Sequence, residues 1–353
     1  MWDAVVGQDR AVGLLQQAVA RPAHAYLLVG PRGSGVEEAA RCFAAEIIGA
    51  ADDPRVPRSR HPDVVEFRPV ATMYSVERDV RAAILPAVHA SPIEGDRKCV
   101  LLLEADRMNP ESANALLKTI EEPPPRTILV LVAESAGEIL PTIRSRCQRV
   151  DFGSIPADVL LAELARRGVA EDIAATVVPL AGGRLDRAVA LAGPLGPLRA
   201  AFADVPARVD GSGARALALA PGLGAAVQDS LAELERAQEA ELAVLEEEIE
   251  RSQYAPRTAQ AMRRRVTDRH KRAARRAGTD ALLEGITAIE SVYRDALAEP
   301  PVNRDRAPLV VDPRAAAAAL DACHEARRAF EFNPNADLLL LRLVLSLPAP
   351  GTA

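Results

Sequence analysis

The chain has 353 residues, a length that predicts two or three domains rather than one core. Hydrophobic residues make up 49% and aromatic residues only 3% of it, which favours helices packed through small and aliphatic side chains. The net charge of −6 excludes a protein that coats nucleic acid through its overall charge, although local basic segments can still contact phosphates.

The sequence up to residue 155 predicts an α/β domain. Residues 25–29, AYLLV, form an expected buried strand, followed by the glycine-rich turn GPRGSG and a helix over residues 36–48. Further apolar runs at residues 99–105, 127–133 and 148–152 predict three more strands, and a helix begins at Asn109-Pro110 and ends before Pro123. Continuous apolar strands that alternate with helices indicate a parallel sheet covered on both faces, here an α/β P-loop domain over residues 1–155.

The rest of the chain is expected to be helical. Residues 156–200 predict a small helical lid, and residues 205–353 predict a separate all-helical domain. A charged helical region over residues 225–277, broken near Pro256, is acidic in its first part and basic from Arg263 to Arg276. The two parts could pair as a solvated hairpin, or the basic part could contact DNA or a partner; both readings stay open.

The glycine-rich turn departs from a working phosphate loop at two positions. A working loop reads G-x-x-x-x-G-K-S/T, in which the lysine meets the phosphates and the hydroxyl holds magnesium. Gly30, Gly33 and Gly35 keep the glycine pattern, but Val36 stands in the place of the lysine and Glu37 in the place of the hydroxyl. Losing one positive charge and gaining a negative one argues against tight ATP binding.

The strand that ends near residue 104 shows a second departure. An active hydrolase places an aspartate there for magnesium and then a glutamate to activate water. This chain has Glu104, which is able to coordinate a metal, and then Ala105, whose methyl group cannot act as a base. Asp106 lies one residue further on, where its side chain points elsewhere.

Isolated cysteines and histidines give no metal-binding pattern. Cys42, Cys99, Cys147 and Cys323 lie far apart without Cys-x-x-Cys spacing, so neither a zinc site nor a disulfide framework is expected. His24 and His61 are read as scaffold residues rather than ligands. The N-terminus lacks a basic segment followed by an apolar stretch, and no apolar run is long enough to cross a bilayer, which predicts a cytoplasmic protein.

Several segments resemble, in order, the delta-prime and gamma/tau group of AAA+ clamp-loader subunits of bacterial DNA polymerase III. They are VVGQ near the start, HAYLLVGPRGSG, HPDV, ANALLKTIEEPP, PTIRSRCQRVDF and, near the end, NPNADLLLLRL. The resemblance implies an AAA+ domain, a lid and a helical collar. It also implies that Arg146, with Ser145 and Cys147 of the same motif, is an arginine finger that reaches into the ATP site of a neighbouring subunit.

The same resemblance bears on other positions. Ala133 stands where active members place a polar residue that senses the terminal phosphate, and Arg184 or Arg187 is near the second sensor, although neither fits its register. The four-cysteine zinc module of the family is expected to be absent, because residues 50–60 contain no cysteine.

The implied function is that of a noncatalytic delta-prime-like subunit that helps to load the sliding clamp. It would bind no ATP or zinc of its own and would work with gamma/tau-type ATPase subunits, a delta subunit, the sliding clamp and primer-template DNA. Two alternatives remain: a scaffold relative outside the clamp loader, and an atypical active ATPase in which Arg32 replaces the missing lysine.

Overall fold

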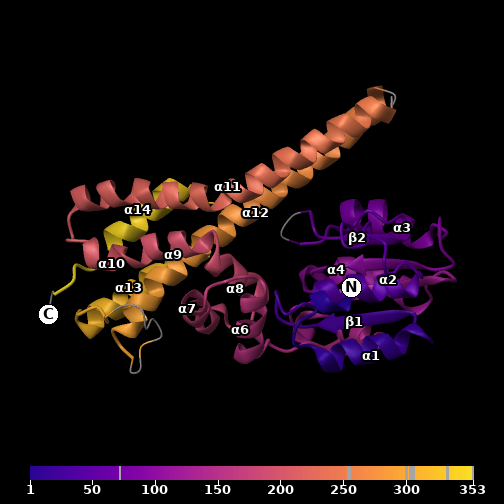
Figure 1. Cartoon of the computed structure of the whole chain (residues 1–353), viewed down its shortest axis with the longest axis horizontal. Helices are drawn as coiled ribbons and strands as arrows, with labels where there is room; N and C mark the ends of the chain where they lie inside the picture. The colour runs from indigo at the N-terminus through magenta and orange to yellow at the C-terminus, as the bar shows by residue number, and fades with distance from the viewer. Residues whose placement is uncertain (71–72, 253–255, 299–300, 302–306, 331–333, 352–353) are drawn as a thin grey trace. The chain divides into compact units, whose positions relative to one another are not determined.

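The computed structural model describes residues 1–70, 73–252, 256–298, 301, 307–330 and 334–351 (Figure 1). The chain divides into two compact units. The first holds Met1–Glu171 with Ala181–Ala188, and the second holds Asp172–Leu180 with Val189–Ala353. The predicted division into residues 1–155, 156–200 and 205–353 stays a prediction.

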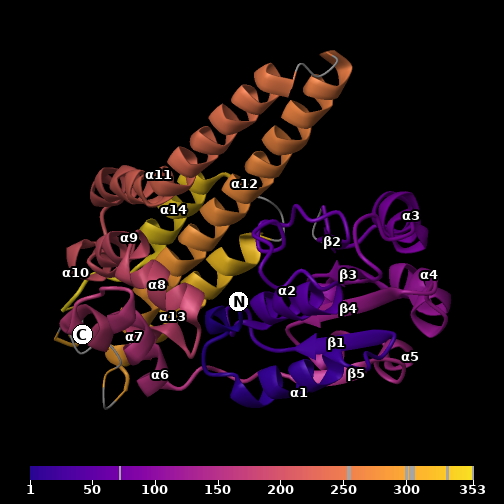
Figure 2. The same cartoon turned by 45° about the vertical axis from the view of Figure 1, so that its right-hand side comes forward.

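A parallel sheet of five strands lies at the centre of the first unit, in the order β2-β3-β4-β1-β5 (Figure 2). The strands are β1 (Ala25–Val29), β2 (Val64–Phe67), β3 (Lys98–Leu102), β4 (Thr127–Ala133) and β5 (Gln148–Asp151). Every residue of β1, β3 and β4 is buried, which explains why these strands are apolar throughout except for Lys98 and Thr127 at the starts of β3 and β4. The predicted parallel sheet is confirmed.

Helices cover both faces of this sheet because alternate strand residues point to opposite sides. Tyr26 and Leu28 enter the core beneath α1 and α2, whereas Ala25 and Leu27 enter the core beneath α4. The helical elements of the first unit are η1 (Trp2–Ala4), α1 (Asp9–Val19), α2 (Val36–Ile47), the π-helix η2 (Val76–Ile84), α3 (Leu85–His89), η3 (Ala105–Arg107), α4 (Pro110–Glu121), η4 (Ala136–Glu138), α5 (Pro141–Arg144) and α6 (Ala157–Arg166).

Strand β2 is the element that the sequence did not predict. Its four residues, VVEF, are too few to stand out as an apolar run, and only Val64 is fully buried. It pairs with β3 along its whole length at the edge of the sheet. The strand matters for the site because it delivers Arg68, the residue that follows it.

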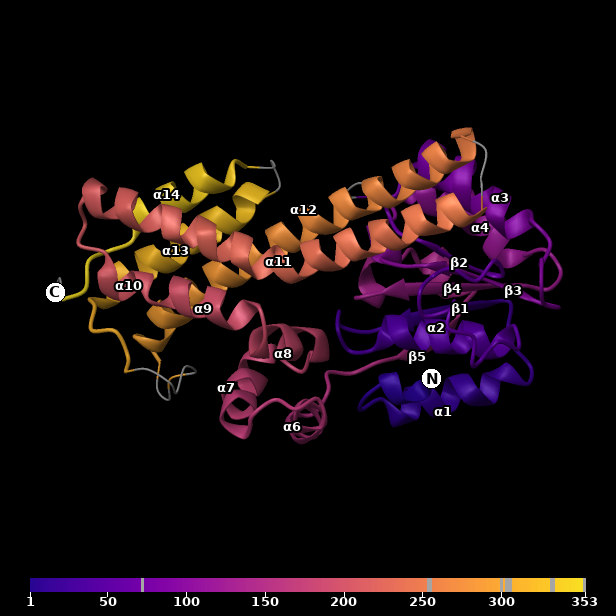
Figure 3. The same cartoon turned by 45° about the horizontal axis from the view of Figure 1, so that its top comes forward.

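The second unit is helical, as predicted. Helices α7 (Glu171–Ala181) and α8 (Leu185–Ala192) cross the boundary between the units. The remaining helices are α9 (Leu195–Ala203), α10 (Val205–Arg208), α11 (Gly213–Ser252), α12 (Pro256–Asp295), α13 (Pro313–Ala329) and α14 (Ala336–Ser346). Figure 3 shows α9, α10, α13 and α14 gathered around the parts of α11 and α12 that are nearest to them.

The core of this unit is closed by the fit between α9 and α12. Phe202 is fully buried, and a Cβ atom at Gly285 would lie only 2.5 Å from its ring. Glycine therefore lets the α12 backbone approach the aromatic ring closely. Tyr293 and Cys323, both fully buried, extend the same core.

The far halves of α11 and α12 run side by side beyond this core, as two views show (Figures 1 and 2). A small separate cluster of Leu245, Ile249 and Ala259, with Met262 and Val266 beside it, holds them together. Within the described residues, no helix combines the length and the apolar character that a membrane crossing needs.

Candidate functional site

The loop after β1 keeps the shape of a phosphate-binding cradle. Gly33 and Gly35 have φ angles of 74° and 88°, in the left-handed region that glycine adopts without strain. The amide of Gly30 donates a hydrogen bond of 3.0 Å to the carbonyl oxygen of Ala133. A Cβ atom at Gly30 would lie 2.6 Å from the Cβ of Phe152, so glycine is required there as well.

Gln8, of the VVGQ segment, fastens this loop to the chain that leaves β5. Its side-chain amide donates to the carbonyl oxygens of Ser34, at 3.1 Å, and Gly153, at 2.7 Å. Its own oxygen accepts a hydrogen bond from the Gly153 amide at 3.2 Å. Because Gln8 is only 6% exposed, the segment is structural and fixes the loop from within.

Three positions at which the sequence departs from a working motif carry buried apolar side chains. Val36 begins α2 and is buried in the core shared with α1, where it takes the place of the phosphate-binding lysine. Ala105 and Ala133 are both almost fully buried, so two methyl groups line the strand ends where an active site needs polar groups. The carboxylate of Asp106 accepts a hydrogen bond of 3.3 Å from the amide of Glu134.

An arginine that the sequence analysis did not single out lies between Glu37 and Glu104. The guanidinium of Arg68 is ion-paired with the carboxylate of Glu37 and lies 2.9 Å from Oε1 of Glu104. Arg107 approaches the other oxygen of Glu104 at 3.1 Å, and Arg41 contacts both Glu37, at 3.5 Å, and Glu66, at 2.8 Å.

The charges of this network support one another. Burial acts to lower the pKa of Arg68, but Glu37 and Glu104 outweigh it and hold that pKa above its usual value. Glu104 is held in a left-handed backbone conformation with φ of 56°, a costly geometry for a residue with a side chain. Its carboxylate is thereby directed to Arg68 and Arg107.

The residues present do not match the donor set of a magnesium-bound triphosphate. In a working loop, a hydroxyl at position 37 and a carboxylate at the strand end share the metal ion. Here the fixed positive charge of Arg68 joins Glu37 to Glu104, and position 36 offers no cation.

A second carboxylate lies against the loop itself. The side chain of Asp186 occupies the space beside Gly33 where a Cβ atom would sit, and the Leu185 amide donates to the Gly33 carbonyl oxygen at 3.1 Å. Burial acts to raise the pKa of Asp186, but Arg184, 2.9 Å away, outweighs it and keeps that pKa below its usual value. Of the two second-sensor candidates, Arg184 is thus committed to Asp186, and the backbone amide of Arg187 donates to the same carboxylate.

Arg146 lies at the N-terminal ends of the parallel strands, whereas the loop lies at their C-terminal ends. It precedes β5, whose first residue, Gln148, pairs with Tyr26 near the start of β1, whereas the loop follows the end of β1. At about 3.3 Å per strand residue, the length of β1 alone separates these two ends of the sheet by roughly 15 Å. Arg146 therefore cannot reach the loop of its own chain.

The side chain of Arg146 is partly exposed and held by neighbours. Its Nε lies 2.5 Å from a carboxylate oxygen of Glu121, at the end of α4, and its Nη1 donates to the carbonyl oxygen of Thr142 at 2.8 Å. Ser145 accepts a further bond from Nη1 at 3.2 Å. Cys147 has a different character: burial raises the pKa of its thiol to about 12, so it is a protonated packing residue.

The HPDV segment has a structural role, because its buried side chains accept hydrogen bonds from backbone amides. Asp63, directly before β2, is fully buried and accepts hydrogen bonds of 2.6 to 2.8 Å from the amides of Ile93, Glu94 and Gly95. His61 lies beside it, and its Nδ1 accepts from the Asp63 amide at 3.1 Å. Within the described residues, no group of three or more His, Cys, Asp or Glu side chains is placed to hold a metal ion.

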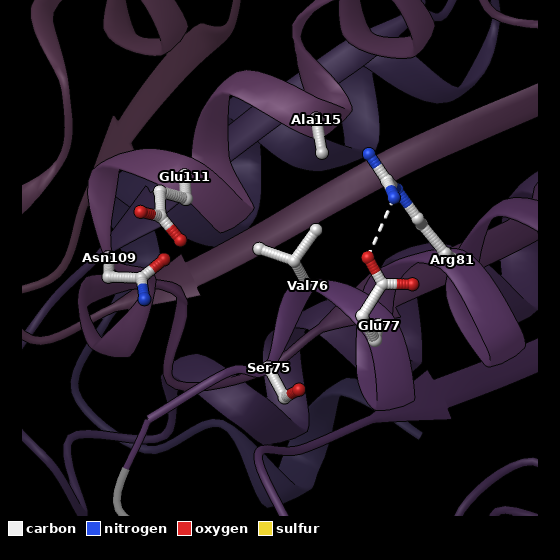
Figure 4. A pocket seen from close by; sticks show the side chains of 7 residues that line it. All are labelled: Ser75, Val76, Glu77, Arg81, Asn109, Glu111 and Ala115. Atoms are coloured by element: carbon white, nitrogen blue, oxygen red, sulfur yellow. Dashed lines mark hydrogen bonds and ion pairs between the residues drawn. The ribbon is translucent and has the colours of Figure 1, made fainter.

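A separate open pocket of about 640 Å³ lies where η2 and α4 begin (Figure 4). Ser75 and Asn109 line it, but both side chains already cap the helices that follow them. Glu77 and Arg81 in its wall are ion-paired at 2.6 Å, and Glu111 adds a negative charge. Because most of these polar groups already serve as helix caps or as an ion pair, no binding role is assigned to the pocket.

The sheet order, the loop after β1 and the helices on both faces define a P-loop domain of the AAA+ class. Residues 7–156 match the family described as DNA polymerase III, delta subunit. Over these residues the chain is similar to delta-prime subunits of DNA polymerase III, in agreement with the resemblance noted in the sequence.

Relatives support this placement. The chain is 36% identical over 139 residues to a DNA polymerase III subunit delta' of Pseudomonas aeruginosa, covering 36% of this chain and 42% of that one. It is 32% identical over 177 residues to a subunit tau of Bacillus subtilis, covering 46% and 31%. The chain thus spans less than half the length of these relatives.

One solved structure matches nearly the whole chain. A DNA polymerase III gamma subunit-related protein from Thermotoga maritima aligns with a TM-score of 0.52 over 95% of this chain and 97% of that one. The sequence identity is 19%, so the likeness shows the fold alone. It extends the shared architecture from the AAA+ domain into the helical C-terminal region.

Proposed function

We propose that the chain is a noncatalytic delta-prime-like subunit of the DNA polymerase III clamp loader, which supplies Arg146 to the ATP site of a neighbouring subunit. The chain itself turns over no ATP and uses neither a nucleotide nor a zinc ion of its own. ATP is bound by the neighbours, and the helical C-terminal region serves as a collar that holds the assembly together.

The observation that carries the proposal is the bridge that Arg68 makes between Glu37 and Glu104. A cation fixed to the protein already neutralises the carboxylates nearest the loop, so a magnesium ion would have to displace a paired arginine. The triphosphate would meanwhile face Glu37 and Asp186 without the lysine that normally offsets its charge.

The position of Arg146 supports action across an interface. It lies at the end of the sheet that is away from its own loop. Its side chain is 38% exposed and so is accessible to another subunit. An arginine finger stabilises the charge that develops on the transferred phosphate, a contribution of orders of magnitude in rate.

The remaining parts of the proposal follow from the assembly. Gamma/tau-type ATPase subunits and a delta subunit would complete a hetero-oligomeric ring in the cytoplasm. The sliding clamp and primer-template DNA would be engaged through the complex. Similarity to both delta' and tau proteins is consistent with a place beside gamma/tau-type subunits.

The test is reconstitution of the loader with gamma/tau-type and delta subunits from the same source. Arg146→Ala should lower DNA-stimulated ATP turnover by about tenfold or more while leaving assembly intact. Arg144→Ala is the matched control, because this exposed arginine lies two residues away and donates a hydrogen bond to the Ala136 carbonyl oxygen instead.

Equal turnover with and without Arg146 would remove the finger from the mechanism. Failure of the intact chain to assemble with gamma/tau-type and delta subunits would favour a scaffold outside the clamp loader. Turnover by the purified chain alone, lost in Arg32→Ala, would favour the atypical ATPase.

A further inference from the structure

The outward face of α12 carries a row of positive charges, here called the basic ridge. It lies on the far half of the hairpin that α11 and α12 form. It consists of five exposed side chains: Arg257, Arg264, Lys271, Arg272 and Arg275. At 1.5 Å per helical residue, the ridge from Arg257 to Arg275 is about 27 Å long.

Helical periodicity explains why these residues share one face. With about 100° per residue, the five positions fall within an arc of roughly 100°. The opposite side of α12 carries Ala259, Met262 and Val266, which pack against α11. The ridge therefore points away from α11.

The ion pairs between α11 and α12 also lie away from the basic ridge. Arg263 and Arg269, on the flanks of α12, are paired with Glu246 and Glu241 of α11 at 2.6 and 2.5 Å. These contacts use the acidic residues of α11 to bind the two helices together. Both paired arginines lie outside the ridge.

Little within the chain neutralises the ridge. Arg264, whose side chain is 84% exposed, has a long contact of 3.8 Å with Asp268, which contributes little stability in water. In the part of the chain that the structure describes, no carboxylate is paired with Lys271, Arg272 or Arg275. Five cations against one carboxylate thus form a local positive surface on a chain of net charge −6.

We propose that the basic ridge binds the phosphate backbone of duplex DNA. A straight row of arginines fits the fixed, regularly spaced phosphates of a duplex, and 27 Å corresponds to about eight base pairs. Protein partners usually need an apolar or aromatic anchor, and the ridge offers none among its residues. The negative charge of the rest of the chain repels DNA and so directs it to this face. The inference does not depend on Arg146 or on the nucleotide site.

The test uses the full chain and a fluorescently labelled duplex of about 20 base pairs, long enough to cover the ridge. Four ridge residues are changed to glutamine, which keeps the helix propensity high: Arg264, Lys271, Arg272 and Arg275. The control variant loses four exposed arginines elsewhere, so that the net charge changes equally: Arg10, Arg21, Arg58 and Arg314. Circular dichroism checks that each variant keeps its helix content.

Binding is measured by anisotropy at several salt concentrations. The ridge variant should bind at least tenfold more weakly at about 0.1 M salt, and the slope of log K against log salt should fall by about 3 to 4. The control should retain most of the affinity and slope. Equal losses in both variants, or no loss in the ridge variant, would overturn the proposal.

Competitors identify the ligand. Duplex DNA should displace the label more effectively than single-stranded DNA or RNA of the same length. A polyglutamate peptide of matched charge should displace it poorly. If the peptide competes as well as the duplex, the ridge is a general anion or protein-binding surface and the assignment to DNA fails.

Discussion

The guanidinium of Arg68 lies 2.9 Å from Oε1 of Glu104 and is also paired with Glu37, and so joins the start of α2 to the segment after β3. Arg68 follows β2, Glu104 follows β3 and Glu37 lies in the first turn of α2. Residues 37 and 104, which correspond to metal-binding positions of a working motif, thus belong to an internal ion-pair network. Its contribution to the fold can be measured independently of any partner.

Arg68→Ala should destabilise the chain, because it leaves Glu37 and Glu104 near each other without their shared cation. We expect a loss of about 1 to 2 kcal/mol in the free energy of unfolding, a modest value since Arg68 is 37% exposed. Chemical denaturation followed by circular dichroism measures it. In a double-mutant cycle, Glu104→Gln should cost less in the Arg68→Ala background than in the wild type; additive costs would show that the bridge contributes no coupling.

Glu121→Ala should distinguish the effect of positioning the Arg146 side chain from the effect of the guanidinium itself. Removing the carboxylate frees the Nε of Arg146 but leaves its bond to the Thr142 carbonyl oxygen. Because the pair is exposed, unfolding should change by less than about 1 kcal/mol. DNA-stimulated turnover of the reconstituted loader should fall, but by less than in Arg146→Ala. Glu122→Ala, at the next exposed position, is the control, and an identical fall there would exclude a specific role for Glu121.

Asp63→Asn should reveal how the stability that Asp63 contributes depends on pH. Burial acts to raise the pKa of Asp63, but the three backbone amides that it accepts from outweigh it and hold the pKa below its usual value. A lowered pKa in the folded state means that ionised Asp63 stabilises the fold above its unfolded pKa of about 3.9 and loses this effect as the pH falls through the folded value.

At pH 6 to 7, where the carboxylate is ionised in both states, the amide should cost about 2 to 3 kcal/mol, since asparagine cannot satisfy all three donors. The difference between variant and wild type should narrow below about pH 4. Asp52→Asn, at an exposed neighbouring position, should show neither effect. A cost that does not vary with pH would mean that shape rather than charge matters at residue 63.

Gly285→Ala should loosen the helical unit. The added methyl group would meet the ring of Phe202 at 2.5 Å in a core where that ring is fully buried, with a cost of about 1 to 3 kcal/mol. Gly278→Ala, on the same helix with its nearest neighbour atom 3.8 Å away, should instead stabilise by up to about 1 kcal/mol. Equal thermal transitions for the two variants would contradict the close approach of α9 and α12.

The elements that the sequence predicted best are those whose signal is local. The runs at residues 25–29 and 127–133 match β1 and β4 because strands buried on both faces must be continuously apolar. Strand β2 escaped notice because it is short and lies at an edge. Helices α11 and α12 are longer than the predicted charged region 225–277, because α11 already begins at Gly213 and continues through Pro221, and α12 extends to Asp295.

The departures from a working motif can be read from the sequence, but the partners of the residues at those positions cannot. Val36, Glu37 and Ala105 can be compared with a working motif position by position. The partners Arg68 and Asp186 lie far away in sequence from the residues they contact, and only the folded chain brings them to Glu37 and Gly33. The pairing of Glu121 with Arg146 is of the same kind.

The most direct test of the account is nucleotide binding by the purified full chain in the presence of magnesium. A fluorescent ATP analogue should show no saturable binding up to millimolar concentration, and no phosphate should be released, because the loop has no lysine and Arg68 occupies both carboxylates. Saturable, magnesium-dependent binding with turnover would contradict the claim that this chain acts only on the ATP of its neighbours.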